Sequence, residues 1–530
     1  MLFRLRLFPY LSLLLWILPL LLLSSGENSV MAHDEGLYAR RSRVMFESGD
    51  WIAPWGTVHH KTPGPYWLIA ISYQLFGISE TSIRLPSMIA GIFSLLLIYE
   101  IGKIILSQNI AWLAGLILSV QFLWLQYCRL GTPDVPMIFL VLLAIFALLQ
   151  AELHDKYRYL WSFIAGLSLG LGFLIRSFMI ILPIVALLPY LIAEHRRHRH
   201  LSNPSLYLGF VVGLIPTSVW LWLNWMRYGS DSYQELVRFV LQLGSNERSG
   251  NGIIFYFWNV PIKAFPWFFF GILGLVLLLR RPLPRYQLIL VGFPITLFGE
   301  LSIFSTRLSH YSLCLYPFIA MLAAVGLSWF AENLYLSPAI KSEDYRENQS
   351  NWVNGKNQPV AGYLSYGFGA LGILLVLAGM VVDNEEIRKY GIVGLIMGCA
   401  WLILPIVWLG RYQFKYWLAG WLIPCWLALA VASGLGLLGD YNPEVRVFLQ
   451  QPAIATILQN HPIYFIQIDG KTAVLLNFYT PIHGGQVNSI TELPPSSYAW
   501  IYATQGAESS TPHQVIGTVK NHQLIRRTGE

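Results

Sequence analysis

The sequence predicts a mostly α-helical protein that crosses a membrane about thirteen times and ends in a small α/β domain. Three observations predict this class. Of the 530 residues, 55% are hydrophobic and 12% are charged, whereas a soluble globular protein carries about 25% charged residues. Apolar runs of about 18–25 residues recur along most of the chain, and each is long enough to cross a bilayer. Roughly the last 90 residues instead alternate short β-rich runs with turns.

The first apolar run extends from about Phe8 to Leu23, behind Arg4 and Arg6. A cleaved signal peptide has a similar basic start and apolar centre, and it is the alternative interpretation. The acidic segment that follows favours the first span of a membrane enzyme. The other expected spans are about 86–106, 110–128, 135–152, 159–175, 177–193, 207–226, 263–280, 286–304, 310–330, 363–382, 390–410 and 414–437.

Cationic side chains in alternate loops predict the orientation of these spans. The positive-inside rule makes loops rich in Lys and Arg cytoplasmic. The N-terminus is then cytoplasmic, as is a polar insertion at about 331–362, while loop 25–85 and the tail face outward. The cationic loops contain Arg4/Arg6, Lys103, Lys156/Arg158, the run His195-Arg196-Arg197-His198-Arg199-His200, Arg280/Arg281/Arg285 and Arg411/Lys415.

This orientation accounts for the net charge of +7 through topology and contact with phospholipids. The charge therefore gives no reason to expect a nucleic-acid partner. We expect a multi-pass protein of the inner (plasma) membrane, with residues 1–437 as its transmembrane domain and 438–530 as an exported, periplasmic domain.

The exported domain is expected to be a small mixed α/β unit with a supporting or acceptor-binding role. It shows no nucleophile elbow, phosphate loop or metal-ligand spacing. Its β-rich runs are Pro462–Ile468, Thr472–Tyr479, Tyr498–Ala503 and Val515–Val519, its helical part is Glu444–Gln459, and a turn is expected at His483-Gly484-Gly485.

Two acidic positions stand out on the outward side. Asp34 and Glu35 follow the first span directly, and Asp134 lies in the short loop between the third and fourth spans. Taken alone, each fits an ordinary helix start, because acids are common there. The topology came from cations alone, and yet it places these acids on one face of the membrane.

The same face receives several cations. Lys61 lies in the first outer loop, where a phospholipid contact is the simpler alternative, and Arg307 with His310 lies in a later loop. Arg176 interrupts an apolar stretch, and an ionisable residue at such depth is a functional candidate. Acids that face cations predict a polar cleft for an anionic lipid substrate.

At these residues the chain resembles the lipid A aminoarabinose transferases and their wider relatives, the dolichyl-phosphate-mannose protein mannosyltransferases. The similarity runs in order through roughly 330 residues. It is carried by Asp34-Glu35-Gly36-x-Tyr38-Ala39, Gly49-Asp50-Trp51, Lys61-x-Pro63-x-x-Tyr66-Trp67, Thr132-Pro133-Asp134, Gly170-x-Gly172-Phe173-Leu174-x-Arg176, Phe265-Pro266-Trp267, and Arg307 with Tyr311 ahead of Pro317.

The resemblance implies a membrane-embedded glycosyltransferase of the GT-C type. Such an enzyme transfers a sugar from a polyprenyl-phosphate donor, here expected to be undecaprenyl-linked, to an acceptor on the far side of the membrane. The acceptor stays open between a lipid such as lipid A, a protein hydroxyl and a cell-surface glycan. Sites that the motifs add as supporting positions are Tyr38, His60, Tyr66, His310 and Tyr311.

The chain departs from the family pattern at a few site positions. Leu37 stands where the family often has a basic residue, and Arg40 or Arg41 is then expected to supply a phosphate contact. His60 stands where a Glu is frequent, which puts a metal site of some relatives in doubt. The chain has Arg176 and Arg307 where the family often has Lys, which keeps the positive charge but replaces a point charge with a planar guanidinium.

Elementary chemistry assigns roles to the main residues. An acceptor hydroxyl that attacks C1 of the sugar needs a base, and Asp34 is our choice, with Glu35 shaping the loop or the acceptor site. The leaving lipid phosphate needs cations, which Lys61, Arg176 and Arg307 can provide. Asp134 could orient the acceptor or hold a cation. A single displacement predicts inversion at C1.

Cofactor use and function class each retain alternatives. His33, His59 and His60 near the acids allow a divalent metal, although adjacent histidines more often form an interfacial or hydrogen-bonding pair. A transporter of a lipid-linked or anionic substrate is the main rival, but transporters concentrate ionisable residues in mid-membrane broken helices. A non-catalytic sensor or scaffold would not need the ordered series of acids and cations.

Overall fold

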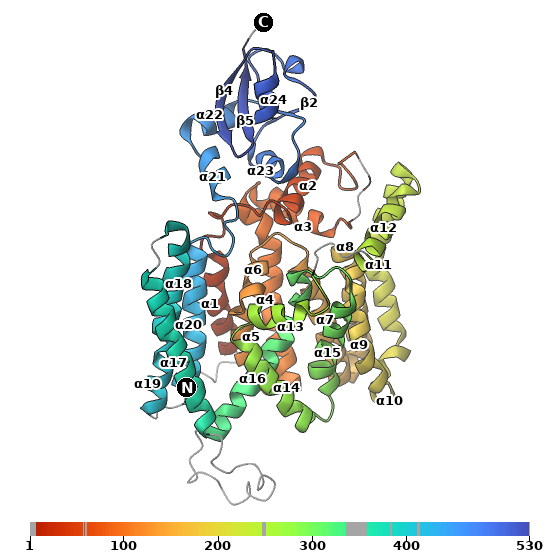
Figure 1. Ribbon diagram of the computed structural model, residues 1–530. Coiled ribbons are helices and arrows are strands. Elements are labelled where there is room, and N and C mark those ends of the chain that lie inside the picture. Colours follow the sequence, from red (N-terminus) through yellow and green to blue (C-terminus); the bar gives the residue numbers. More distant parts are fainter. Residues whose placement is uncertain are drawn as a thin grey trace, which may run out of the picture.

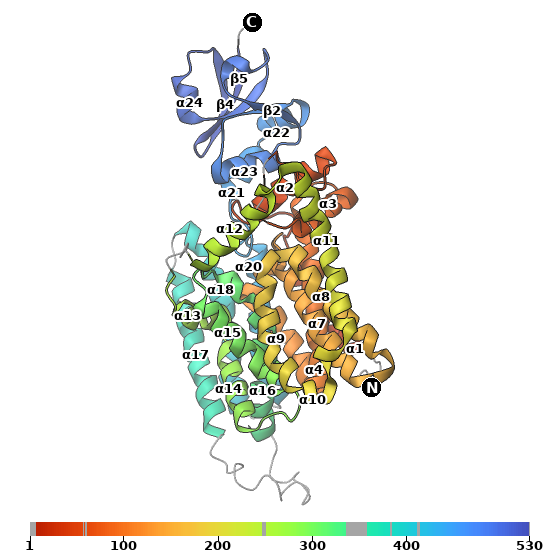
Figure 2. The same ribbon diagram turned by 90° about the vertical axis from the view of Figure 1, so that its right-hand side faces the viewer.

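The chain folds into a long helical bundle capped at one end by a small α/β domain (Figures 1 and 2). The computed structural model describes residues 7–528, apart from 57, 59–60, 246–250, 335–357, 382–383 and 411–413. The described N-terminal end and helix α10 (His195–His198) lie at one end of the bundle, and the α/β domain lies at the other. The expected fold class, mostly helical with a C-terminal α/β part, is confirmed.

The bundle is built mainly from apolar helices. Its helices are α1 (Phe8–Leu22), α4 (Glu80–Ile105), α5 (Gln108–Ser119), α6 (Phe122–Cys128), α7 (Asp134–Leu153), α8 (Arg158–Arg176), α9 (Ile181–Ala193), α11 (Pro204–Tyr228), α13 (Phe255–Lys263), α14 (Trp267–Arg280), α15 (Phe293–Ile303), α16 (Tyr316–Leu334), α17 (Gln358–Val381), α18 (Glu385–Trp401), α19 (Ile403–Leu409) and α20 (Phe414–Gly434). Short turns of helix join some of them, namely η2 (Asp155–Tyr157), η3 (Ser177–Ile180), η4 (His200–Ser202), the π-helical η5 (Leu288–Gly292) and η6 (Ser309–Leu315).

Length and composition allow eight helices of the described chain to cross a membrane, or up to ten if each of two bent pairs is one span. The bent pairs are α5 with α6, at 70°, and α13 with α14, at 112°. One of the eight, Asp155–Ala193, contains two of the expected spans. Two further expected spans correspond to the shorter apolar helices Phe8–Leu22 and Leu288–Ile303. The number thirteen therefore stays a prediction.

Outside the bundle, the expected outer loop folds into helices of its own. Helices α2 (Glu35–Ser48) and α3 (Gly64–Phe76) lie between the bundle and the α/β domain, as Figure 1 shows. Helix α2 ends at Gly49, whose φ of 69° is the left-handed conformation that commonly stops a helix. A further helix, α12 (Asp231–Ser245), follows α11 at the same end.

The α/β domain contains a mixed five-stranded sheet of order β2-β1-β3-β5-β4. Strands β1–β3 are parallel to one another, and β5 runs antiparallel to β3 and β4. Its elements are α21 (Pro443–Leu449), α22 (Pro452–Asn460), β1 (Ile463–Ile466), α23 (Gly470–Tyr479), β2 (His483–Val487), η9 (Ile490–Glu492), β3 (Tyr498–Tyr502), α24 (Ala503–Glu508), β4 (His513–Val519) and β5 (His522–Arg527).

Two local expectations in this domain were wrong. The run Thr472–Tyr479 lies in helix α23, because two neighbouring parallel strands need a crossover and this run supplies it. The expected turn His483-Gly484-Gly485 begins strand β2. The boundary near residue 437 falls between α20 and α21, and we keep it as a proposal. The insertion expected at about 331–362 lies mostly outside the described residues.

Helices α8 and α11 pack unusually closely. A Cβ atom built on Gly209 of α11 would lie 2.0 Å from the carbonyl oxygen of Phe163 on α8. A Cβ on Gly166 would lie 1.9 Å from the carbonyl oxygen of Leu206. Small residues that let helix backbones approach are a usual means of packing helices in membranes. This contact holds the helix whose last residue is Arg176.

We expect Gly209→Ala to lower the thermal unfolding midpoint of the detergent-purified protein. The added methyl group must push α8 and α11 apart, at a cost of at least about 1–3 kcal/mol. Gly367→Ala on α17 is the matched control, because its Cβ would meet no atom within 4 Å. Equal midpoints for the two variants would contradict this account of the packing.

Candidate active site

Three helix ends converge on one cavity at the end of the bundle that is nearer the α/β domain. Asp34 precedes the first residue of α2, and Asp134 is the first residue of α7. Arg176 is the last residue of α8. The helix dipole stabilises an acid at a helix N-terminus and a cation at a C-terminus, so each side chain occupies a favourable position. The two acids expected on one face of the membrane therefore do lie together.

The cavity has a volume of about 830 Å³. Its polar part contains both acids together with Lys61 and Arg176. Another part of its wall is apolar and comes largely from η3, the start of α9 and Phe304. The residues that line it are His33, Asp34, Leu37, Tyr38, Lys61, Thr62, Pro65, Tyr127, Thr132, Pro133, Asp134, Ile175, Arg176, Ser177, Phe178, Met179, Ile181, Leu182, Phe304, Thr306, Leu308, Ser309, His310 and Tyr311.

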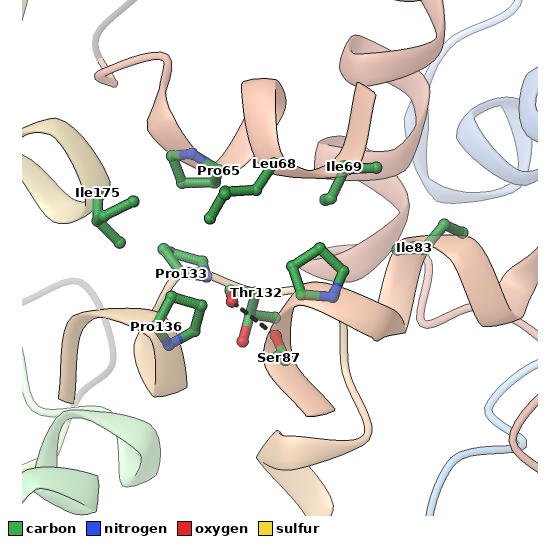
Figure 3. Close-up of a pocket in the computed structure, with 11 residues that line it drawn as sticks. Pro65, Leu68, Ile69, Ile83, Ser87, Thr132, Pro133, Pro136 and Ile175 are labelled. Atoms are coloured by element: carbon green, nitrogen blue, oxygen red, sulfur yellow. Dashed lines mark hydrogen bonds between the residues drawn. The ribbon is translucent and has the colours of Figure 1, made fainter. Parts of the chain in front are cut away.

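Tight apolar packing supports the turn that carries Asp134. Figure 3 shows Pro65, Pro133 and Pro136 around this turn, and the Ser87 hydroxyl donates a hydrogen bond of 3.1 Å to the carbonyl oxygen of Thr132. The space left between these side chains is about 10 Å³, at the limit for one water molecule. The turn has little room to move.

The break between α8 and α9 is also held in place. Ser177 has a φ of 49°, a left-handed backbone conformation that is uncommon for a residue other than glycine. Its hydroxyl lies 3.1 Å from that of Thr62 in the outer loop. A Cβ on Gly64 would lie 2.5 Å from the carbonyl oxygen of Leu174, so the start of α3 lies directly against the end of α8. Strained backbone of this kind is often found at functional sites.

Asp134 and Arg176 form a nearly buried ion pair in the cavity wall. Arg176 Nη1 lies 2.7 Å from Asp134 Oδ1. The guanidinium carbon of Arg176 also lies 5.6 Å from the centre of the Tyr311 ring. The position of this cation is thus set from two sides, and one carboxylate oxygen of Asp134 is already engaged.

Asp34 differs from Asp134 in its surroundings. Among the described residues, its carboxylate has no hydrogen-bond or ion-pair partner, and it lines the cavity. A carboxylate that is open to the cavity can accept a proton from a substrate hydroxyl, whereas one engaged by Arg176 is less available.

Lys61 completes the polar part. Its ammonium nitrogen donates to the Tyr38 hydroxyl at 3.2 Å and lies 4.7 Å from the centre of that ring. Burial lowers the pKa of Lys61, with further lowering from Arg176 and Arg41, while Tyr66 and Asp34 act in the opposite direction. Burial likewise raises the pKa of Tyr38, so its hydroxyl stays protonated.

Seven expected site residues line the cavity, and the other described ones (Glu35, Arg40, Tyr66 and Arg307) are not part of its wall. Those that line it are Asp34, Tyr38, Lys61, Asp134, Arg176, His310 and Tyr311. Tyr66 packs behind Tyr38 with ring centres 5.3 Å apart, and its hydroxyl accepts a 3.4 Å hydrogen bond from Arg41. Arg40 is half-buried on α2 and is not part of the wall. His60 lies outside the described residues.

Glu35 lies outside the cavity in a fully buried ion pair with Arg84 of α4. Arg84 Nε and Nη2 donate to the two carboxylate oxygens at 2.8 and 3.1 Å. The same oxygens accept from the backbone N–H groups of Met31, at 2.9 Å, and Gly131, at 3.1 Å. These contacts do not support a catalytic role for Glu35; they support the loop-shaping role that we also considered.

Arg307 also turns away from the cavity. Its Nε donates to the carbonyl oxygen of Ser302 at 3.0 Å, and its Nη1 donates to that of Asn251 at 2.8 Å. Its neighbours Thr306 and Leu308 do line the cavity. The guanidinium therefore shapes the segment that forms this wall, and a direct contact with donor phosphate is not supported.

Several residues of this site were missed by the sequence analysis. Tyr127 lines the cavity, and its ring lies 5.4 Å from that of His310. No local signal marks such a tyrosine. Arg84 could have been found, because it interrupts an apolar helix in the same way as Arg176 does. Among the described residues, no group of three or more His, Cys, Asp or Glu side chains is placed so that it could hold a metal ion. His59 and His60 are not among the described residues.

Comparison with known proteins places this geometry in context. The model of the dolichyl-phosphate-mannose-protein mannosyltransferase family matches residues 60–222. The undecaprenyl phosphate-α-4-amino-4-deoxy-L-arabinose arabinosyl transferase of Pectobacterium carotovorum is 26% identical over 83% of this chain and 78% of its own length. An uncharacterized Aquifex aeolicus protein is 25% identical over 59% of this chain and 63% of its own length.

Solved structures show the same fold. The crystal structure of ArnT from Cupriavidus metallidurans bound to undecaprenyl phosphate has a TM-score of 0.75 at 19% identity, over 98% of this chain and 97% of that one. The Archaeoglobus fulgidus oligosaccharyltransferase has a TM-score of 0.51 at 13% identity, over 91% and 65%. The comparisons confirm the GT-C fold, the expected resemblance and a multi-pass membrane glycosyltransferase in preference to a transporter.

We expect Glu35→Gln to destabilise the detergent-purified protein by about 3–5 kcal/mol, because it leaves the buried Arg84 charge unpaired. The midpoint of thermal unfolding measures this effect. Glu444→Gln is the matched control, since Glu444 pairs with Lys520 on the surface, where such a pair contributes at most about 1 kcal/mol. A Glu35→Gln protein as stable as the control would contradict the structural role of this pair.

Proposed function

We propose that the cavity transfers a sugar, with inversion at C1, from an undecaprenyl-phosphate donor to a hydroxyl or similar group of an acceptor on the periplasmic side. The observation that carries the proposal is the pairing pattern of the two acids. Arg176 Nη1 lies 2.7 Å from Asp134 Oδ1, while Asp34 lines the cavity and its carboxylate has no hydrogen-bond or ion-pair partner among the described residues. One acid is thus suited to holding a cation and the other to accepting a proton.

Lys61 and Arg176 are suited to binding the donor phosphate. A phosphodiester that loses its sugar gains negative charge on the bridging oxygen, and two cations at the cavity wall stabilise that charge. The Asp134 ion pair and the Tyr311 ring hold the Arg176 guanidinium ready for this contact. The phosphate thus leaves without needing a proton.

Asp34 is proposed as the base. The acceptor oxygen forms a bond to C1 of the sugar as the bond from C1 to the phosphate oxygen breaks, and the acceptor proton moves to the Asp34 carboxylate. The products are the glycosylated acceptor and the polyprenyl phosphate. A single displacement inverts the configuration at C1, since no covalent intermediate intervenes.

The apolar part of the cavity suits the donor's isoprenoid chain. Phe178, Met179, Ile181 and Leu182 lie along one wall, and Ile181 is 40% exposed at the surface of the bundle. A polyprenyl chain can then leave the cavity toward surrounding lipid while its phosphate stays near Lys61.

The identity of sugar and acceptor rests on analogy. The Pectobacterium relative is named for a 4-amino-4-deoxy-L-arabinose donor, and this sugar is therefore the first to test here. A lipid acceptor agrees best with the relatives, and protein and glycan acceptors remain to be tested. The positive-inside rule supports a cytoplasmic N-terminus with the cavity and the α/β domain in the periplasm.

We expect Asp34→Asn to lower the rate of sugar transfer by about 10²–10⁴-fold, because it removes the proposed general base. Membranes from cells without endogenous homologues would be supplied with a panel of radiolabelled undecaprenyl-phosphate sugars, and label in the acceptor would be counted. Asp50→Asn is the matched control: Asp50 lies in the same outer region, pairs with Arg227 and is not part of the cavity wall.

Each outcome of this assay decides something. Equal transfer by wild type and Asp34→Asn would exclude Asp34 as the base, and Asp134 would be tested next. Failure of the correctly inserted wild-type protein to consume any donor in the panel would count against the glycosyltransferase proposal itself.

The buried position of Lys61 predicts a pH dependence. Burial lowers its pKa from 10.5, so the ammonium loses its charge at a lower pH than an ordinary lysine. As the pH rises through this lowered pKa, kcat/KM for the donor should fall. Lys61→Arg keeps its charge, and its alkaline limb should lie at higher pH. Identical alkaline limbs in the two proteins would assign the titration to another group.

A further inference from the structure

Arg43 connects helix α2 to the α/β domain through a set of backbone contacts. The side chain projects from α2 and is almost fully buried. Nη1 donates to the carbonyl oxygens of Phe478 and Thr480 at 2.8 and 2.7 Å, and Nη2 donates to that of Pro481 at 2.7 Å. A fourth carbonyl oxygen, that of Asn477, lies 3.3 Å from Nη1.

These carbonyl groups lie at the C-terminal end of helix α23. The last carbonyls of a helix have no partner within it and carry the negative end of its dipole. A guanidinium satisfies several such groups at once because its N–H donors form a planar fork. On its own helix, Arg43 Nε donates to Glu47 Oε1 at 2.6 Å, which directs the fork toward α23.

Other contacts join the same two parts of the chain. The N–H group of Val30 donates to the Tyr479 hydroxyl at 3.0 Å, and a Cβ on Gly36 would lie 3.1 Å from Val474 Cγ1. Apolar side chains of α2, α3 and the α/β domain form one continuous buried cluster, which includes Ala39, Met45, Tyr66, Ile69, Phe448, Leu475, Phe478 and Trp500. Helix α2 therefore packs against the α/β domain.

Asp34 lies at the N-terminal end of this helix, and Tyr38 follows within it. The Tyr38 hydroxyl accepts a hydrogen bond from Lys61. We propose that the α/β domain sets the position of α2 in the active site, and that Arg43 is the positioning residue through which it does so. This inference rests on the proposed function, in which Asp34 accepts the acceptor proton. The α/β domain thereby acts on the transfer step without contacting the donor.

The test compares Arg43→Gln and Arg43→Lys with wild type in the full-length, detergent-purified protein. Arg527→Gln is the matched control, because Arg527 also donates to backbone carbonyls but only within the α/β domain, at Thr491 and Leu493. Two quantities are measured: kcat and the donor KM for sugar transfer, and the rate of amide hydrogen exchange in residues 36–46.

We expect Arg43→Gln to lower kcat by about 10–100-fold, since a displacement of about 1 Å at a reacting group can have an effect of this size. The donor KM should change less than threefold, because Arg176 is held by Asp134 and Tyr311, which do not lie on α2. Amide exchange in α2 should become faster, and Arg43→Lys should recover part of both losses. Arg527→Gln should match wild type in kcat and in α2 exchange.

A wild-type kcat and unchanged α2 exchange in Arg43→Gln would overturn the inference, as would equal losses of kcat in Arg43→Gln and Arg527→Gln. The parallel Asp34→Asn measurement separates this result from the proposed function. Faster α2 exchange in Arg43→Gln together with a fully active Asp34→Asn would leave the connection intact and remove Asp34 as the base.

Discussion

The buried ion pair between Glu35 and Arg84 is the constraint on which the rest of the outer site depends. One carboxylate accepts from the Arg84 guanidinium and from the backbone N–H groups of Met31 and Gly131. Glu35 is the residue after Asp34, and Gly131 is three residues before Asp134. Both cavity acids are therefore positioned from the same buried charge. Since a buried charge without its partner is very unfavourable, these segments are strongly held together.

The site combines two chemical environments that a single substrate would need. Asp34, Asp134 and Arg176 lie at helix ends, where backbone dipoles favour them, and the apolar wall begins within the same cavity at Phe178. A lipid-linked anion has the same division between head and tail. Burial of Lys61 and Arg176 strengthens their attraction for phosphate, and it also lowers the pKa of Lys61.

Hydropathy and cationic loops were sufficient to predict the helical bundle and the common location of Asp34, Lys61, Asp134 and Arg176, because both signals are local in the sequence. Partner choice was not predictable, since it depends on distant segments. Asp34 and Glu35 are adjacent acids, and only the fold shows that Glu35 pairs with Arg84, which lies 49 residues away in the sequence. Arg307 was a plausible phosphate ligand until its backbone partners at Ser302 and Asn251 were known. Helix α23 was mistaken for a strand because the sheet order, and not local composition, requires a crossover there.

The connection between the first outer helix and the last domain has a consequence for biosynthesis. Ser29 contacts Asp440, 411 residues later, and Arg43 reaches carbonyls more than 430 residues away. Translation proceeds from the N-terminus, so helix α2 is synthesised long before α23 exists. The chain can therefore complete the packing around α2 only after its final segment has been synthesised. A chain truncated before residue 470 would therefore lack the packing that holds α2.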